Sequence, residues 1–209
     1  MPESKPRRRI QAERSALTRR KLLSAAREMF IADGYNATTM TRVAERAGVA
    51  VQTVYFVFHT KGELLTHVYE AAVLGDDRPT PPDESDWYRL ASTTSDLHDA
   101  IDAFTGGCAA ILRRTAPLEA VVRAAGPTEP DVQAAHNNGE VLRQRGYRAF
   151  VDTLAQRRLL PDTADREQTT DVLLTLLGPH VYATLTMDRG WSHQQYVDWA
   201  VRVIPQLLT

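Results

Sequence analysis

Side chains that can contact the edges of DNA bases stand together shortly after Gly48. Gln52 carries an amide that can hydrogen-bond to N6 and N7 of adenine at the same time. Ala50 and Val51, just before it, can make only apolar contacts, for which the methyl group of thymine is the most useful partner in a DNA groove. Lys61 follows at the start of an expected helix, where an anion such as a phosphate is favoured. These residues predict nucleic-acid binding and not bond-making chemistry.

The sequence contains no pattern that would support catalysis. It has no Gly-x-Ser-x-Gly nucleophile elbow, no phosphate-binding glycine loop and no dinucleotide fingerprint, and none of its six histidines has the spacing of a zinc-protease or di-iron site. Cys108 is the single cysteine, which excludes a disulfide framework and an all-cysteine metal site. We therefore expect a protein that is not an enzyme and that binds no cofactor and no metal. An all-α enzyme with an incidental DNA-binding motif is the alternative from another class.

Charge is unevenly divided along the 209 residues. Residues 1–61 contain 12 lysines and arginines against five acidic residues, whereas residues 62–209 contain 13 arginines, no lysine and 21 acidic residues. Such asymmetry favours contact of the basic part with a polyanion, although a solvated basic tail is the alternative. The arm Arg7–Arg9 could enter a minor groove or stay in solvent. Because no apolar stretch is long enough for a secretion signal or a membrane span, the expected location is the cytoplasm, with no membrane partner.

Apolar spacing predicts four helices before residue 75. The first begins near residue 13 and ends at Gly34, and the second is a short helix between the N-cap Thr39 and Gly48. The third starts three or four residues later, and the capping box Thr60–Glu63 opens the fourth. Two short helices joined by a tight glycine turn and braced by a longer helix have the outline of a helix-turn-helix, although a generic helical bundle can share this spacing.

The third helix and its flanks carry a specific set of residues, namely the turn Ala47-Gly48-Val49, the pair Thr53-x-Tyr55, Phe58, and Thr60-Lys61. At this spacing they resemble the DNA-binding domain of the TetR (tetracycline-repressor-type) family of transcriptional regulators. The resemblance covers about residues 14–73, a third of the chain. It implies a helix-turn-helix domain with a basic N-terminal arm over residues 1–75, and an effector-binding and dimerisation domain over residues 76–209. Ala50 departs from the family, which usually has a phosphate-binding serine there.

The resemblance and the position of each residue in the helix-turn-helix indicate which side chains meet DNA. Thr41 and Arg42 stand where family members contact bases or phosphates. Thr53 and Tyr55 of the third helix, and Lys61 at the start of the fourth, stand where family members contact phosphates. Tyr55 and Phe56 have an alternative role in packing between helices. The expected DNA-binding residues are Thr39, Thr41, Arg42, Ala50, Val51, Gln52, Thr53, Tyr55, Phe56 and Lys61.

After a connector rich in proline and acidic residues, only helical periodicity follows, so we expect an all-α chain. The expected effector is apolar or aromatic, because the second half has no lysine and lacks the buried arginine cluster or glycine loop that a phosphorylated ligand requires. It would be held near the Gly106-Gly107 pair, which indicates either close helix packing or room for a ligand. The expected ligand-binding residues are Phe104, Cys108, Arg123, His136, Tyr147, Phe150 and Tyr182, with Arg143 as a second charged anchor; each aromatic could instead be an ordinary core residue.

Two helices near the C-terminus carry more apolar residues than a small core needs. They are expected over about residues 166–187, with a break at Gly178-Pro179, and 192–208, and they predict a homodimer interface formed by Val172, Leu176, Trp199, Val203 and Leu207. The same stripe could pack inward. The complete hypothesis is a homodimeric repressor that binds double-stranded palindromic DNA and is released by a small-molecule effector. A DNA-binding regulator without an effector is the alternative.

Overall fold

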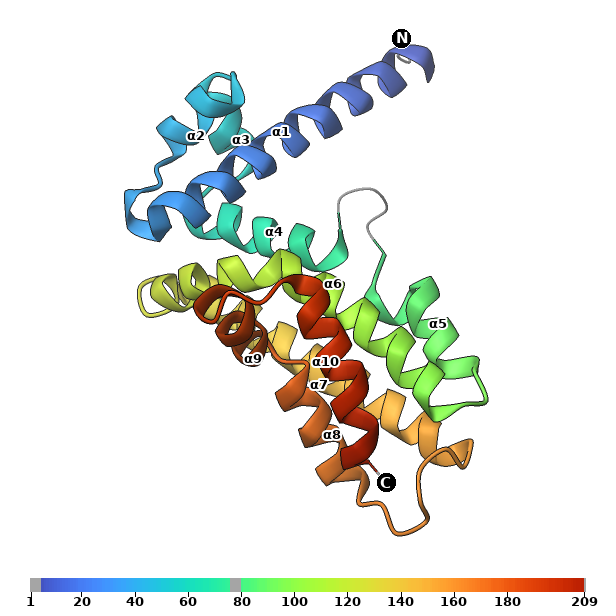
Figure 1. The fold of residues 1–209 in the computed structure, drawn as a ribbon. Coiled ribbons are helices and arrows are strands. Elements are labelled where there is room, and N and C mark those ends of the chain that lie inside the picture. The colour runs from blue at the N-terminus through green and yellow to red at the C-terminus, as the bar shows by residue number, and fades with distance from the viewer. Residues whose placement is uncertain (1–4, 76–79, 209) are drawn as a thin grey trace. The chain divides into compact units, whose positions relative to one another are not determined.

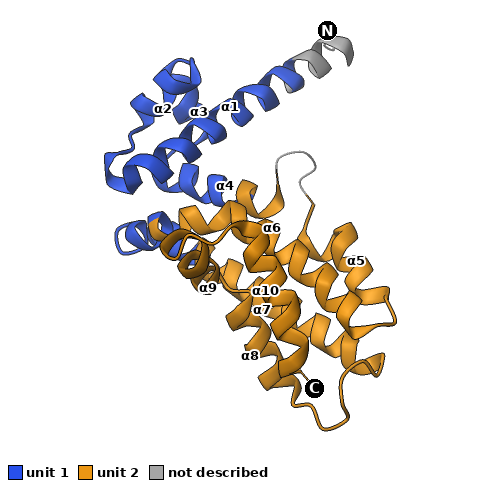
Figure 2. Ribbon diagram, viewed as in Figure 1, with its two compact units in different colours: residues 1–70, 121–134 blue, residues 71–120, 135–209 orange. Residues whose placement is uncertain are grey.

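The computed structural model describes residues 5–75 and 80–208, without the side chains of residues 5–10 and of Ala12. The arm Arg7–Arg9 therefore lies, by its side chains, outside the described part. The described residues form helices and connecting loops, so the expected all-α class is confirmed. They divide into two compact units, the first made of residues 1–70 and 121–134 and the second of residues 71–120 and 135–209 (Figure 2). No helix in the described ranges is both long enough and apolar enough to cross a membrane.

The first unit begins with α1 (Lys5–Ala37), which is interrupted at Gly34 (Figure 1). Gly34 has a φ of 78° and a ψ of 176°, a conformation that residues with a side chain rarely adopt, so the regular helix ends where the sequence predicts. The buried face of α1 includes Leu22, Ala26 and Phe30. The hydroxyl of Thr38 donates to the carbonyl of Gly34 at 2.8 Å and closes the turn that leads into the next helix.

Two short helices follow, α2 (Met40–Ala47) and α3 (Val51–Val57). Thr39 is the N-cap of α2, as expected, and its hydroxyl accepts from the backbone N–H of Arg42 at 3.2 Å. Gly48 ends α2 in the left-handed conformation, with a φ of 68°, which lets the chain turn sharply enough to start α3 three residues later. These features build the helix-turn-helix that the sequence predicts.

The remainder of the first unit comes from α4 (Lys61–Leu74) and from a corner far along the chain. The corner, residues 121–134, joins the end of α6 (Leu97–Ala125) to the start of α7 (Pro130–Gln156). A side chain at Gly62 would place its Cβ 3.0 Å from an oxygen of Glu129 and 3.4 Å from Val132, so α4 begins against this corner. The helix-turn-helix unit therefore includes a segment outside the expected range of residues 1–75.

The second unit surrounds one apolar core formed by helices from its whole length. Besides most of α6 and α7, it contains the 3₁₀ turn η1 (Pro82–Glu84), α5 (Asp86–Thr93), α8 (Arg166–Leu176), α9 (Pro179–Ala183), the π-helical turn η2 (Thr184–Asp188) and α10 (His193–Leu207). The expected break at Gly178-Pro179 separates α8 from α9. A complete capping box opens α10, because Ser192 and Gln195 each bond to the backbone of the other.

Two features of the second unit are not evident from the sequence pattern. Pro117 lies inside α6, which continues past it to Ala125. Proline removes one helical hydrogen bond but does not end a helix that is held by packing on both sides, and here Ala116 and Leu118 are buried. The helix α5 follows the connector, where no individual helix was predicted, and it contributes Trp87 and Tyr88 to the core.

Candidate DNA-binding surface and ligand site

The exposed face of α3 is formed by four of the residues expected to meet DNA. At 100° per residue, Val51, Gln52, Tyr55 and Phe56 lie within about 140° of one another, opposite the buried side chain of Val54. Phe56 is 85% exposed and Tyr55 is 50% exposed, so the alternative that these rings fill the core is wrong for Phe56. Gln52 is exposed as well. The face can therefore approach another molecule without any change in the packing of the unit.

The other residues of α2 and α3 that are expected to contact DNA differ in their exposure to solvent. Ala50, the N-cap of α3, is exposed and makes no side-chain capping bond. Thr39 and Thr41 are exposed at the start of α2, and Thr53 is half-buried. Side chains at the beginning of both short helices are thus accessible together.

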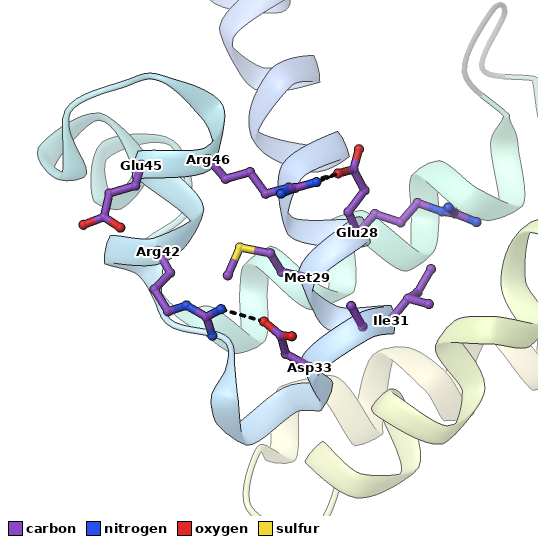
Figure 3. A pocket seen from close by; sticks show the side chains of 9 residues that line it. Glu28, Met29, Ile31, Asp33, Arg42, Glu45 and Arg46 are labelled. Atoms are coloured by element: carbon purple, nitrogen blue, oxygen red, sulfur yellow. Dashed lines mark hydrogen bonds and ion pairs between the residues drawn. The ribbon is translucent and has the colours of Figure 1, made fainter.

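Arg42 lies in a charged groove between α1 and α2 (Figure 3). Its guanidinium donates to the carbonyl of Ala37 and to the carboxylate of Asp33, both at 2.8 Å, while Arg46 pairs with Glu28 across the same groove. The groove has a volume of about 680 Å³, and charged side chains form most of its lining. Arg42 is consequently bound to its own unit, and a contact with DNA would require it to share or leave these partners.

Lys61 is also held within the first unit. Its ammonium donates to the carbonyl of Tyr35 at 3.0 Å and lies 4.0 Å from the centre of the Tyr35 ring. The hydroxyl of Tyr35 donates in turn to Glu129 at 2.6 Å. Burial, reinforced by the hydrogen bond to Glu129 and by its charge, raises the pKa of the Tyr35 phenol, so this hydroxyl remains a donor. The chain of contacts connects the end of α1, the start of α4 and the corner.

Four of the expected ligand-binding residues meet in the core of the second unit. The rings of Phe104 and Phe150 are stacked with centres 3.9 Å apart, and the Tyr147 ring meets Phe104 edge-on at 5.1 Å. Cys108 is buried beside Tyr147. Burial raises the pKa of the Cys108 thiol to about 12, although a hydrogen bond with Tyr147 opposes the shift. The cluster is therefore apolar, uncharged and closely packed.

Polar groups at one side of this cluster bind the end of α8. The hydroxyl of Tyr147 donates to the carbonyl of Leu177 at 3.0 Å, and Arg143 donates to that of Leu174 at 3.3 Å. Arg143 also pairs with Glu140 at 2.7 Å. These donors satisfy carbonyls that the break at Gly178-Pro179 leaves without helical partners. The expected anchor Arg143 thus already has an internal role.

The other three expected ligand-binding residues are placed differently. Tyr182 is buried, and its hydroxyl lies 2.9 Å from Nδ1 of His193, which the sequence did not single out. His136 is half-buried on the first turns of α7. Arg123 is exposed, belongs to the first unit and lies about 22 Å along α6 from Cys108, so it is not part of the aromatic cluster.

Trp87 and Arg114 belong to the candidate ligand site but were not predicted. Trp87 packs edge-on against Phe104, and its indole covers Gly107 so closely that an added Cβ would lie 2.0 Å from the ring. Gly107 therefore serves close packing, whereas Gly106 has open space beside it. A cavity of about 440 Å³ adjoins Trp87, and Arg114 in its lining donates to the last carbonyls of α4, those of Ala72 and Val73. In the sequence, the signals that could have indicated this contact were a tryptophan just after the connector and the glycine Gly107 in α6.

The residues expected at the dimer interface lie at the surface of the second unit. Val172, Leu176, Trp199 and Val203 are half-buried, and Leu207 is 55% exposed. Beside them, Tyr196, Ala200 and Ile204 form the buried face of α10. The apolar side chains of these helices thus form an inward, buried face and an outer face that the rest of the unit covers only in part. Within the described ranges, no cluster of acidic, histidine or cysteine side chains is arranged to hold a metal ion.

Residues 22–68 match the model of the bacterial regulatory proteins of the tetR family. A comparison with curated protein sequences gives no match. A TetR-family transcriptional regulator from Mesorhizobium loti is similar in structure, with a TM-score of 0.71, 21% identity and coverage of 93% of this chain and 98% of that one. The fatty acid degradation regulator FadR from Bacillus halodurans has a TM-score of 0.72 at 13% identity, covering 90% and 94% of the two chains.

FadR from Bacillus subtilis, solved in complex with stearoyl-CoA, has a TM-score of 0.68 at 12% identity and covers 88% of this chain and 96% of its own. At these identities, the structural likeness establishes the fold, while the sequence match lies in the helices that build the helix-turn-helix. Regulators of this kind bind DNA and are not enzymes. The sequence match and the shared fold thus agree with the exposed recognition helix: residues 22–68 form a DNA-binding domain of the tetR family, within a chain that has the fold of TetR-family transcriptional regulators.

Proposed function

We propose that the protein is a homodimeric repressor that binds a palindromic operator through α3 of each copy and leaves it when a small apolar or aromatic molecule binds the second unit. The observation that carries the DNA-binding part is the exposed face of α3, on which Gln52 and Phe56 are free to reach base edges. A helix of this kind enters the major groove, and two-fold symmetry of a dimer requires two matching half-sites.

Each DNA-binding residue has a distinct proposed role. Ala50, Val51, Gln52, Tyr55 and Phe56 meet the major groove, whereas Thr39, Thr41 and Thr53 contact phosphates at its rim. Arg42 and Lys61 add positive charge near the backbone while they keep the internal bonds described above. The basic residues Arg7–Arg9, at the beginning of the chain, supply further charge for phosphate contacts.

The ligand part of the proposal rests on the aromatic cluster around Phe104. A planar or elongated apolar molecule can replace ring contacts such as that between Phe104 and Phe150, and the cavity beside Trp87 offers an entrance from the surface of the unit. The Bacillus subtilis FadR, which has the same fold, binds a molecule with a long apolar chain. The apolar rings around Cys108 favour a ligand whose buried part is neutral. A regulator without an effector remains the second candidate, supported by the close packing of these rings.

Dimerisation is assigned to α8 and α10, whose outer faces carry the half-buried apolar residues Val172, Leu176, Trp199 and Val203. Burial of such a face between two copies removes apolar surface from water, which is the main driving force of obligate interfaces. A dimer built this way would present two copies of α3 to one DNA duplex.

Two linked measurements test the proposal. The protein is first mixed with a random-sequence duplex library, and the bound fraction is expected to become enriched in one palindrome. A thermal-shift screen against fatty acids, acyl-CoA esters and aromatic compounds is then expected to find a stabilising ligand that also releases the protein from that palindrome, because coupling between the two sites must be reciprocal. No enriched sequence would overturn the DNA-binding proposal. An enriched palindrome without any stabilising ligand would favour the regulator that has no effector.

A further inference from the structure

The recognition helix offers DNA an uncharged and largely apolar face. No lysine, arginine, aspartate or glutamate occurs between Val51 and Val57. Phe56 is 85% exposed and Tyr55 is 50% exposed, and the half-buried Val51 lies at the other edge of the same face of α3. A cluster of exposed apolar side chains is unfavourable in water, so its presence on a recognition surface points to an apolar partner.

The cations closest to this helix in the sequence have partners within the first unit. Arg42 is bound by Asp33 and by the Ala37 carbonyl, Arg46 by Glu28, and Lys61 by the carbonyl and ring of Tyr35. The commonest specific contact with a guanine–cytosine pair is an arginine or lysine that bonds O6 and N7 of guanine. In each of these three side chains, the bonds within the first unit already direct the charged group toward that unit, and a contact with guanine would compete with them.

The major groove presents one apolar group on an unmodified base, the C5 methyl of thymine. Apolar side chains gain by covering that methyl, and a glutamine recognises adenine with two bonds, to N6 and N7. Phe56 lies one turn after Gln52, so the two side chains can reach neighbouring base pairs of one strand. The amide on this face therefore matches adenine, and the apolar side chains match the methyl group of thymine.

We propose that α3 reads a half-site of adenine–thymine pairs, with Gln52 on adenine and with Phe56 and Val51 on thymine methyl groups. This inference rests on the proposed operator binding and adds the base composition of the site. It also identifies Phe56 as a specificity-determining residue.

The test uses the full chain and the palindrome enriched from the random library. Each thymine in a half-site is replaced in turn by deoxyuridine, which removes only the C5 methyl. We expect at least one replacement per half-site to weaken binding about fourfold, the effect of one buried methyl-sized group. The Phe56→Ala variant should bind the thymine and deoxyuridine duplexes equally at that position, whereas Phe56→Leu should keep part of the difference.

The matched control is Leu142→Ala, which shortens another exposed apolar residue, on α7 in the second unit, and should leave the deoxyuridine effect unchanged. Because Phe56 is exposed, its variants keep the fold, and thermal unfolding of the variants verifies this. An enriched palindrome with guanine–cytosine pairs at the centre of each half-site, or one whose deoxyuridine effects persist in Phe56→Ala, would overturn this inference alone. A library without any enriched palindrome would overturn the proposed function together with it.

Discussion

The ammonium of Lys61 is held by a carbonyl and an aromatic ring of the same unit, although its position in the sequence suggested a phosphate contact. Lys61→Met keeps the apolar part of the side chain and removes the charge. We expect it to lower the free energy of unfolding by about 1–2 kcal/mol, because both the hydrogen bond and the contact with the Tyr35 ring are lost. Urea unfolding followed by circular dichroism measures the change, and unchanged stability would contradict the internal role.

The same variant separates the internal role of Lys61 from a contact with DNA. If Lys61 also neutralises a phosphate, the slope of log affinity against log salt concentration should fall by about 1. Lys21→Met, at an exposed position of α1, is the control for a general loss of charge. Both roles are compatible with the structure, since an ammonium has three donors and the Tyr35 carbonyl occupies one.

Cys108 is expected to be unreactive in the folded protein. Burial raises the pKa of its thiol to about 12, so the reactive thiolate is scarce near neutral pH and the sulfur is inaccessible. Iodoacetamide at pH 8 should therefore label the unfolded protein in urea and leave the native protein unlabelled. Rapid labelling of the native protein would show that the cluster around Phe104 opens readily.

The raised pKa of Cys108 also makes stability depend on pH. Below about pH 8.5 the thiol is protonated in both states, and its contribution to stability is complete. Between that pH and about 12 the unfolded chain loses the proton first, so the free energy of unfolding should decrease by up to about 1.4 kcal/mol per pH unit. Cys108→Ala lacks this slope, and the difference between the two proteins isolates it from the effect of other groups.

At the scale of elements, the contact between α5 and α6 depends on a single missing side chain. Gly107→Ala places a methyl group 2.0 Å from the Trp87 ring, so the indole must move, and we expect the protein to lose about 1–3 kcal/mol of stability. Gly106→Ala, one residue earlier, meets open space and should gain up to about 1 kcal/mol from helix propensity. Urea unfolding measures both, and equal effects would contradict the packing assigned to Trp87.

Local signals explain how much of the fold could be predicted. Thr39, Gly34 and Gly48 act within one helical turn of their own positions, so their sequence patterns located helix ends that the structure confirms. The helix α5 escaped prediction because it is short and has one fully buried residue, Ala91, which gives no clear periodicity. The caps showed where helices end, but not which helices pack together.

Prediction of the candidate DNA-binding site has the same limit: the local motif was visible in the sequence, but the tertiary contacts were not. The motif around Thr53 and Tyr55 identified α3, and its spacing was enough to expect an exposed face. The partners of Arg42 and Lys61 and the contact between Tyr35 and Glu129 could not be predicted, because the last pair is 94 residues apart and helical periodicity does not identify the facing element. The positions of Trp87 and Arg114 depend on tertiary packing for the same reason.

At the scale of the whole molecule, the proposed assembly of two copies uses the outer face of α8 and α10. Val203→Glu places a charge on the half-buried part of this face, where burial against a second copy would be costly. We expect sedimentation to show a folded monomer, with helical content unchanged. Asp198→Glu, an exposed position on the same helix, should remain dimeric. A folded dimer of Val203→Glu would contradict this interface.

The corner at residues 121–134 limits how the chain can be divided and recombined. Glu129 and Val132 complete the unit that contains the recognition helix, yet they stand about fifty residues beyond the connector. A fragment ending at residue 75 would leave Tyr35 and the start of α4 without this support and should unfold at lower urea concentration than the intact chain. Exchange of the DNA-binding unit between such regulators, in the laboratory or by gene recombination, would therefore have to include the corner at residues 121–134. Otherwise a second change would have to restore the Tyr35–Glu129 pair.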